Sequence, residues 1–185
     1  TENEISQATK AAVSQAKAQG CLISFDVNLR HNLWSSGKAD IVLVNELVAM
    51  ADIIKFSRDE LDYLAQNQVE DYLANCLNQG VSVIVITDGE HPIELCTRQG
   101  QQIIAVPEVT AVDTTAGGDA FSGALLFALS QLPDPAKALD SIELISKLVK
   151  FASFCGAHTV TAPGAFPALP SFIDIHQYWP TELYA

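Results

Sequence analysis

Basic residues are scarce in this sequence: 10 Lys and Arg stand against 22 Asp and Glu among 185 residues, a formal net charge of −12. A surface with this balance repels nucleic-acid phosphates and anionic lipids, so neither nucleic acid nor membrane is expected as a partner. The sequence also lacks an apolar run near the ~20 residues that cross a bilayer, and no signal peptide is recognisable. We therefore expect a cytoplasmic protein.

Cysteine is sparse as well, and no two cysteines have the C-x-x-C spacing of zinc or redox sites. The four are Cys21, Cys76, Cys96 and Cys155. This pattern predicts free thiols in a reducing compartment. Hydrophobic residues make up 49% of the chain, which excludes a disordered protein. The length suits one core, so a single domain over residues 1–185 is expected.

Helix-like and strand-like segments alternate along the chain. Helices are expected over residues 4–19, 38–50, 58–66, 69–79, 118–131 and 135–157, followed by a short C-terminal helix. Strands are expected over residues 21–26, 52–56 and 81–87, and a β-hairpin over 93–98 and 101–106 with Gln99-Gly100 as its turn. The alternation predicts a three-layer α/β/α, Rossmann-like parallel sheet with helices on its faces.

The most informative segment is Asp-Thr-Thr-Ala-Gly-Gly-Asp-Ala-Phe, residues 113–121, which precedes an apolar helix. A helix start carries unpaired N–H groups and the positive end of the peptide dipole, so it attracts anions such as phosphate. Glycines let an anion approach the backbone closely, and a carboxylate there could take a proton from an attacking hydroxyl. Asp is also common at ordinary helix starts, so the spacing alone leaves both interpretations open.

This segment resembles the C-terminal signature of the ribokinase-like (PfkB) carbohydrate kinases, usually Asp-Thr-x-Gly-Ala-Gly-Asp-x-Phe. The resemblance implies a ribokinase-like fold and ATP-dependent phosphorylation of a sugar hydroxyl with Mg²⁺. By resemblance, Asp119 is the catalytic base, and the amides of Ala116, Gly117, Gly118 and Asp119 form an anion hole. The sequence departs from the pattern by having Ala116-Gly117 where the family commonly has Gly-Ala.

Three earlier segments resemble the family in the same order. Residues 25–34, FDVNLRHNLW, are similar to a fructokinase segment in which Asn28 and Arg30 lie near the transferred phosphate or the sugar. Ser57 and Glu60 have capping-box spacing, and the resemblance adds water-mediated binding of Mg²⁺ by Glu60 beside the nucleotide. Residues 87–90, TDGE, resemble a turn that brings Thr87 and Gly89 to ATP.

The closing helix and loop, residues 151–165, are similar to a family segment that flanks adenine. In many members, carbonyl groups of this loop and of the Asp-Thr-x segment bind a monovalent cation such as K⁺. The candidate ligands by position are Asp113, Thr115, Thr159, Ala162 and Gly164, and Thr115 and Gly117 are also candidates for binding the nucleotide. The four histidines are scattered and are expected to be surface or packing residues.

The resemblance covers nearly the whole chain but only the C-terminal portion of the family. The opening strand, the glycine-rich segment and the small β-sheet lid, which supply most sugar contacts and in many members a homodimer interface, have no counterpart here. We therefore expect an N-terminally truncated ribokinase-like fold with little kinase activity alone. Fructose is the expected acceptor. Ribose, a nucleoside or 2-keto-3-deoxygluconate remain alternatives, as does a non-catalytic domain that senses nucleotide or sugar.

Overall fold

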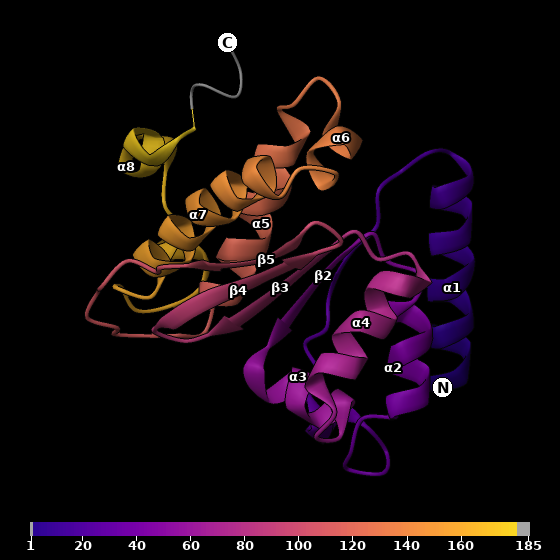
Figure 1. Ribbon diagram of the computed structural model, residues 1–185. Coiled ribbons are helices and arrows are strands. Elements are labelled where there is room, and N and C mark those ends of the chain that lie inside the picture. The colour runs from indigo at the N-terminus through magenta and orange to yellow at the C-terminus, as the bar shows by residue number, and fades with distance from the viewer. Residues whose placement is uncertain (1, 181–185) are drawn as a thin grey trace. The chain divides into compact units, whose positions relative to one another are not determined.

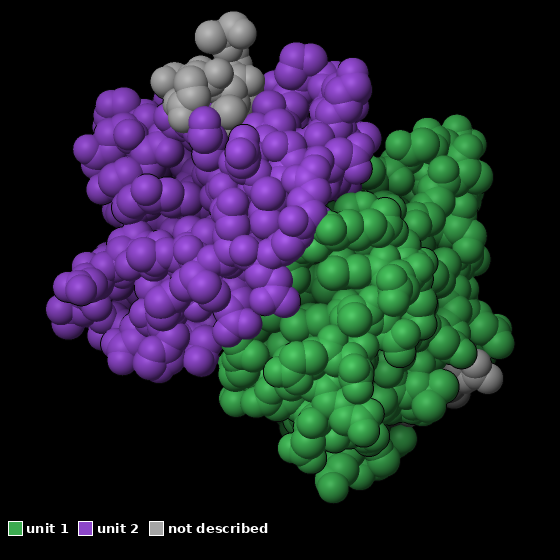
Figure 2. Space-filling model, viewed as in Figure 1, with its two compact units in different colours: residues 1–87, 96–98 green, residues 88–95, 99–185 purple. Residues whose placement is uncertain are grey.

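The computed structural model describes residues 2–180 and divides into two compact units (Figures 1 and 2). The first unit contains the described residues up to 87 together with 96–98. The second contains residues 88–95 and the described residues from 99 onward. The single α/β domain expected over residues 1–185 stays a prediction. No helix among the described residues is both long and apolar enough to cross a membrane.

The first unit alternates helices with strands, as the sequence predicts. It holds α1 (Glu2–Ala18), α2 (Ile41–Val48), α3 (Arg58–Ala65), α4 (Val69–Gln79), β1 (Ser24–Asp26), β2 (Ile53–Ser57) and, up to its last residue, β3 (Val83–Asp88). A 3₁₀ turn spans His31–Leu33. Helix α1 is tied to α2 by an ion pair between Lys10 and Glu46, and Lys17 in its last turn pairs with Asp52 at 3.3 Å.

The second unit contains the hairpin and the C-terminal helices. It holds most of β4 (His91–Thr97), then β5 (Gly100–Ile104), α5 (Gly117–Ser130), α6 (Pro135–Leu139), α7 (Ile142–Thr159) and α8 (Phe172–Ile175). Two further 3₁₀ turns span Phe166–Ala168 and His176–Tyr178. Helices α5 and α7 lie against each other in Figure 1.

The strand order of the sheet is β1-β2-β3-β4-β5, and β1, β2 and β3 run parallel. The last two strands cannot continue that direction. Two residues separate β3 from β4, and two separate β4 from β5, whereas a parallel connection needs a crossover of a dozen or more. The predicted parallel sheet is therefore limited to its first three strands, and the expected hairpin extends a mixed sheet. Its turn is Arg98-Gln99 rather than Gln99-Gly100.

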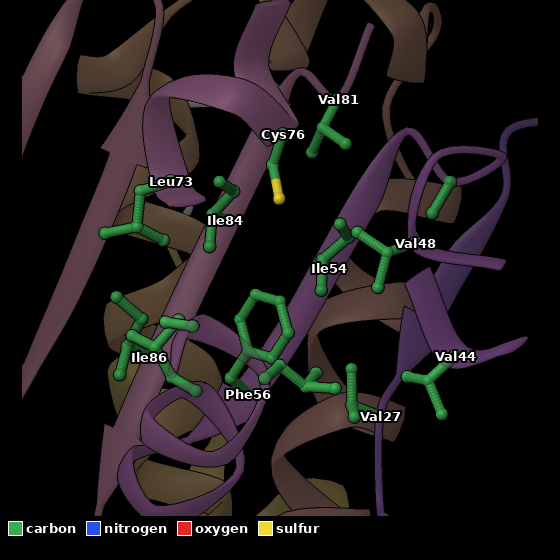
Figure 3. Close-up of a cluster of buried hydrophobic side chains, with 14 of the residues drawn as sticks. Val27, Val44, Val48, Ile54, Phe56, Leu73, Cys76, Val81, Ile84 and Ile86 are labelled. Atoms are coloured by element: carbon green, nitrogen blue, oxygen red, sulfur yellow. The ribbon is translucent and has the colours of Figure 1, made fainter. Parts of the chain in front are cut away.

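The core of the first unit explains why β2 and β3 form. Both are dense in β-branched and aromatic residues, and the residues of β3 from Val83 to Ile86 are buried on both faces, as in a central parallel strand. One face of these strands packs against residues of α2 and α4 (Figure 3). The cluster includes Val44, Val48, Ile54, Phe56, Leu73, Cys76, Ile84 and Ile86.

One predicted helix is two helices. The sequence predicts a continuous helix over 135–157, but the structure ends α6 at Leu139 and begins α7 at Ile142. Ser141 caps α7 by accepting a hydrogen bond from Leu144 N–H at 3.2 Å. Gln99 at the hairpin turn accepts from Ile142 N–H at 2.9 Å and donates to the carbonyl of Asp140. The hairpin therefore pairs with one backbone group on each side of this break.

Candidate active site

The carboxyl ends of β1, β2 and β3 lie in register at one edge of the sheet. Asp26, the last residue of β1, is paired with Lys55, and Ser57 at the end of β2 is paired with Thr87. Lys55 Nζ donates to both carboxylate oxygens of Asp26 at 2.9–3.0 Å. Thr87 Oγ1 donates to the carbonyl of Phe56 at 3.3 Å. Ligands of parallel α/β sheets gather at such an edge, so the polar residues of these three loops are site candidates.

The loop after β1 has an unusual backbone. Asn28 and Arg30 both have left-handed φ values, 44° and 39°, a conformation that costs about 1 kcal/mol or more for arginine and less for asparagine. Their side chains are exposed, whereas Val27 and Leu29 are buried, with 7% and 5% of their surface accessible. The alternation directs the two polar side chains of the Asn28–Arg30 segment away from the core.

Glu60 links this loop to α3. The capping box predicted from the sequence is present: Ser57 Oγ accepts from Glu60 N–H at 3.3 Å, and Glu60 Oε2 accepts from Ser57 N–H at 2.8 Å. The other carboxylate oxygen, Oε1, accepts from the N–H of Leu29 at 2.9 Å. Each hydrogen bond of a backbone N–H to a charged acceptor contributes on the order of 1.5–3 kcal/mol, which offsets strain in the loop.

Aromatic residues hold the rest of the loop. Trp34 Nε1 donates to the carbonyl of Leu29 at 2.9 Å. His31 Nδ1 accepts from Ala39 N–H at 3.1 Å, and its ring meets the edge of Tyr63 at 4.5 Å between centroids. His31 is thus a packing residue, as expected. The sequence did not reveal the hydrogen bond between Leu29 and Glu60, because a contact between residues 31 positions apart leaves no local pattern.

The start of α5 lacks a side-chain cap. Its N-cap is Ala116, whose methyl side chain cannot accept a hydrogen bond. Gly117 N–H is directed to the carbonyl of Thr114 at 3.3 Å, but the N–H groups of Gly118 and Asp119 meet no acceptor within residues 2–180. Both residues are exposed. The helix start therefore has no side-chain cap, and the N–H groups of Gly118 and Asp119 remain available to an anion or to water, so the anion-binding interpretation stays a prediction.

Gly117 has a packing role that the sequence did not indicate. A Cβ atom on Gly117 would lie 2.7 Å from Val160 Cγ1, and one on Gly156 would lie 3.0 Å from the carbonyl oxygen of Gly117. The two glycines let α5 and the end of α7 approach closely at this point. Gly117 is therefore required by its neighbours in the fold, whatever approaches the helix from solvent.

Asp113 joins the loop before α5 to the loop after α7. Its Oδ1 accepts from the N–H and hydroxyl of Thr115, and its Oδ2 accepts from Gly164 N–H at 2.9 Å. These hydrogen bonds, chiefly that of the Thr115 hydroxyl, hold the pKa of Asp113 below its ordinary value. In addition, Val112 and Asp113 donate their N–H groups to the carbonyl of Val160 at 2.7 and 3.2 Å. The two loops are braced together.

The expected cation ligands are only partly gathered by these contacts. Asp113, Thr115 and Gly164 are joined by hydrogen bonds. Thr159 is fully buried, and its hydroxyl donates to the carbonyl of Cys155 at 2.9 Å. Ala162 lies in the turn that follows. Within the described part of the chain, no group of three or more His, Cys, Asp or Glu could hold a metal ion, so the Mg²⁺ and K⁺ sites stay predictions.

The site residues thus fall into two groups, one in each unit. The first unit brings Asn28, Arg30, Ser57, Glu60 and Thr87 to the carboxyl edge of its strands. The second unit gathers Asp113, Thr115, Ala116, Gly117, Gly118 and Asp119 at the start of α5, with Gly164 attached through Asp113. Gly89, with φ 55°, occupies the turn between β3 and β4.

This arrangement, an uncapped glycine-containing helix start with an exposed carboxylate in its first turn, coincides with a family pattern. A family model for "pfkB family carbohydrate kinase" matches residues 3–171. The chain belongs to the pfkB family of carbohydrate kinases. The predicted family is confirmed, and the matched range includes the start of α5.

Relatives within the pfkB family include fructokinases. A fructokinase of Vibrio alginolyticus is 33% identical over 171 residues, covering 92% of this chain and 54% of the relative. The structure of a fructokinase from Xylella fastidiosa with bound ATP has a TM-score of 0.87 at 30% identity, covering 96% of this chain and 57% of the other. The predicted ribokinase-like α/β fold is confirmed by such matches.

A second related structure contains both a sugar and a nucleotide. A double mutant of fructokinase from Vibrio cholerae O395, in a form with bound fructose, ADP and potassium ion, has a TM-score of 0.84 at 34% identity. The match covers 94% of this chain and 55% of the Vibrio cholerae chain. The chain thus spans about half the length of each of these three relatives.

Proposed function

We propose that this pfkB-family chain provides the phosphoryl-transfer part of an ATP-dependent sugar kinase, with fructose as the acceptor. The observation that carries the proposal is the start of α5, where two unpaired N–H groups and the exposed Asp119 lie in the segment that resembles the family signature. Bound ATP in one relative, and fructose with ADP in another, support this choice of substrates.

In the proposed reaction, Asp119 accepts the proton of a sugar hydroxyl. The hydroxyl oxygen forms a bond to the γ-phosphorus while the bond from that phosphorus to the β–γ bridging oxygen breaks, and ADP leaves with the released electron pair. The N–H groups of Gly118 and Asp119, at the positive end of the helix dipole, stabilise negative charge on the transferring phosphoryl oxygens. Ala116 and Gly117 shape the turn that presents these donors.

The residues of the first unit have supporting roles in this proposal. Arg30 offers a planar set of donors suited to phosphate, and Asn28 beside it can donate to the phosphate or the sugar. Thr87 and Gly89 lie on the nucleotide side. Asp113, Thr115, Thr159, Ala162 and Gly164 are proposed to surround a monovalent cation, which the potassium-bound relative supports.

The environment of Glu60 suits an indirect role with Mg²⁺. Each of its oxygens already accepts one backbone N–H, and an ionised carboxylate has about four lone-pair positions, so two remain for water molecules that hold the metal. Mg²⁺ supplied with ATP neutralises charge on the phosphate groups.

The test is turnover of an Asp119→Asn variant, measured by coupled ADP release with fructose, ribose, a nucleoside and 2-keto-3-deoxygluconate as acceptors. The protein must contain this chain together with a sugar-binding half. We expect the variant to lose at least about 100-fold in kcat, the range of general-base catalysis, while it still binds ATP. Glu143→Gln, which neutralises an exposed carboxylate in the first turn of α7, is the matched control. Retained turnover in Asp119→Asn would exclude this role.

The 185-residue chain alone should turn over fructose far more slowly than a full-length fructokinase. Positioning both substrates provides much of the rate of phosphoryl transfer, and this chain spans only about half of its relatives. Turnover by the isolated chain that matches a full-length relative in the same coupled assay would contradict this proposal.

A further inference from the structure

The carboxylate of Glu60 is engaged on two sides by the protein itself. Its Oε2 completes the capping box of α3 by accepting from Ser57 N–H at 2.8 Å. Its Oε1 accepts from Leu29 N–H at 2.9 Å, a residue 31 positions earlier in the chain. Only the first of these contacts is explained by helix capping. The second joins α3 to the loop after β1 and needs a separate reason.

Leu29 is the fixed point of that loop. Its N–H is held by Glu60, its carbonyl accepts from Trp34 Nε1 at 2.9 Å, and its side chain is buried. On either side of it, Asn28 and Arg30 have left-handed φ values and exposed side chains. Left-handed backbone is unfavourable for arginine and is tolerated better by asparagine, and the hydrogen bonds of Leu29 fix the backbone between these two residues.

Helix α3 contacts the loop at a second point on the same face. Tyr63, three residues after Glu60, donates its hydroxyl hydrogen to the carbonyl of Ala39 at 2.8 Å and packs its ring against His31. Residues three apart on a helix lie on the same face. Two points of attachment, one near each end of the loop, make α3 the support for the loop.

We propose that Glu60 is a positioning residue that fixes the backbone of Asn28–Arg30, and thereby the directions of the Asn28 and Arg30 side chains. The two-oxygen carboxylate is needed because Ser57 and Leu29 each direct an N–H at it, and an amide has only one accepting oxygen. Both hydrogen bonds that make up this hold are between groups of the protein itself. Its value for catalysis rests on the proposed function, in which Asn28 and Arg30 contact phosphate or sugar.

The direct test is amide hydrogen exchange at Leu29, followed by NMR in the ligand-free chain with EDTA. In Glu60→Gln we expect exchange of the Leu29 amide to accelerate by about tenfold or more, as a charge-assisted hydrogen bond is lost, and its proton resonance to move upfield. Glu60→Asp, which keeps the charge but shortens the side chain, should behave in the same way.

The matched control is Asp59→Asn, which removes an exposed carboxylate from the same first turn of α3. It changes the charge at the helix start equally and should leave Leu29 exchange within about twofold, because the hydrogen bond to Glu60 stays intact. If Leu29 exchange is unchanged in Glu60→Gln, or rises equally in Asp59→Asn, the proposal is wrong. A role limited to Mg²⁺ predicts the first of these outcomes in a metal-free sample.

A double-mutant cycle on Mg–ATP binding tests whether the hydrogen bond from Leu29 to Glu60 positions the Arg30 side chain. Titration calorimetry with Mg–ATP would compare Arg30→Ala, Glu60→Gln and the double variant. If Glu60 acts through Arg30, removing Arg30 weakens binding by about tenfold in the native background, but by less than about twofold after Glu60→Gln. Fully additive losses would contradict the positioning role. Absence of Mg–ATP binding by the native chain would count against the proposed function, while Leu29 exchange would still decide the role of Glu60.

Discussion

Residue size controls how closely α5 and α7 meet beside the candidate anion hole. The common order of the family signature places Gly at position 116 and Ala at 117, whereas this chain has Ala116 and Gly117. The structure gives a physical reason for the exchange: Val160 occupies the space that a side chain at position 117 would need. Ala116 in turn is buried with 5% of its surface accessible, so its methyl group is accommodated.

Gly117→Ala should therefore destabilise the chain. The added methyl group would lie 2.7 Å from Val160 Cγ1, and overpacking of this kind typically costs about 1–3 kcal/mol. Adding Val160→Ala should recover part of the loss, because it removes the atom that clashes. Urea denaturation of the two single variants and the double variant gives the coupling free energy.

Gly123→Ala is the matched control for this cycle. Gly123 lies in the interior of the same helix, and a Cβ there meets no atom within 4 Å. The substitution should stabilise the protein by about 0.5–1 kcal/mol through helix propensity. Equal effects of alanine at positions 117 and 123 would show that the contact with Val160 has no energetic weight.

The cysteines differ in burial, and we therefore expect them to differ in reactivity. All four are free thiols, as the sequence predicts; Cys21 is exposed and the other three are buried. Burial raises the pKa of Cys76 to about 11 and that of Cys155 to about 11. At pH 8 only ~0.1% of a thiol with such a pKa is thiolate, the reactive form.

Alkylation with iodoacetamide at pH 8 should consequently label Cys21 alone in the native protein. We expect Cys76 and Cys155 to react at least roughly 100-fold more slowly, and to become labelled only when urea unfolds the chain. Peptide mass spectrometry identifies the modified sites. Rapid native labelling of Cys155 would indicate that α7 opens readily beside the candidate site.

Individual residues also show which contacts of the candidate site could be predicted from the sequence. Ser57 and Glu60 are three positions apart at the start of a helical pattern, so their capping box was predictable and is confirmed. The contact between Glu60 and Leu29 could not be predicted, because the two residues meet only after β1 and β2 pair. The unpaired N–H groups of Gly118 and Asp119 became evident only once Ala116 was placed as the N-cap.

Among the elements, the loop before α5 depends on Asp113 for its attachment to the loop after α7. Hydrogen bonds from Thr115 and Gly164 favour the ionised carboxylate, so the pKa of Asp113 lies below its ordinary value in the folded chain. A depressed pKa contributes stability above the ordinary value of about 3.9. That contribution is lost as the pH falls through the folded-state pKa.

Asp113→Asn should lower the melting temperature at pH 7, where an ionised Asp113 stabilises the two loops, and the difference from native should shrink toward pH 3. Thermal unfolding followed by circular dichroism across this range measures the difference. Glu108→Gln, an exposed carboxylate in the loop before α5, is the control and should be close to neutral throughout. A difference that persists unchanged at pH 3 would show that the ionised carboxylate is not its source.

The elements themselves were predicted well where local signals were strong. Residues 69–79 form the expected helix, and β-branched residues correctly marked β2 and β3. The break between α6 and α7 was missed because Gln99, which pairs with backbone groups on both sides of it, is distant in sequence. The reversal at Gly89 was expected as a sharp turn, but not as the beginning of the antiparallel pairing.

For the molecule as a whole, family membership confirms the α/β architecture that the alternation of segments predicted. Trp179 illustrates what that alternation cannot reveal: it packs against Phe127 of α5 and Phe151 of α7, which fastens the last described residues to the second unit. The physiological acceptor, the cytoplasmic location and a homodimeric state stay predictions. The ATP-binding role can be tested on the 185-residue chain itself.

Titration of the chain with Mg–ATP, followed by NMR, is the decisive experiment for ATP binding at the start of α5. We expect saturable binding at one site, with the amide resonances of Gly118 and Asp119 among the largest shifts because phosphate occupies their unpaired N–H groups. Gly123, further along the same helix, should shift little. Absence of saturable binding at millimolar Mg–ATP, or binding that leaves Gly118 and Asp119 unshifted, would contradict the account.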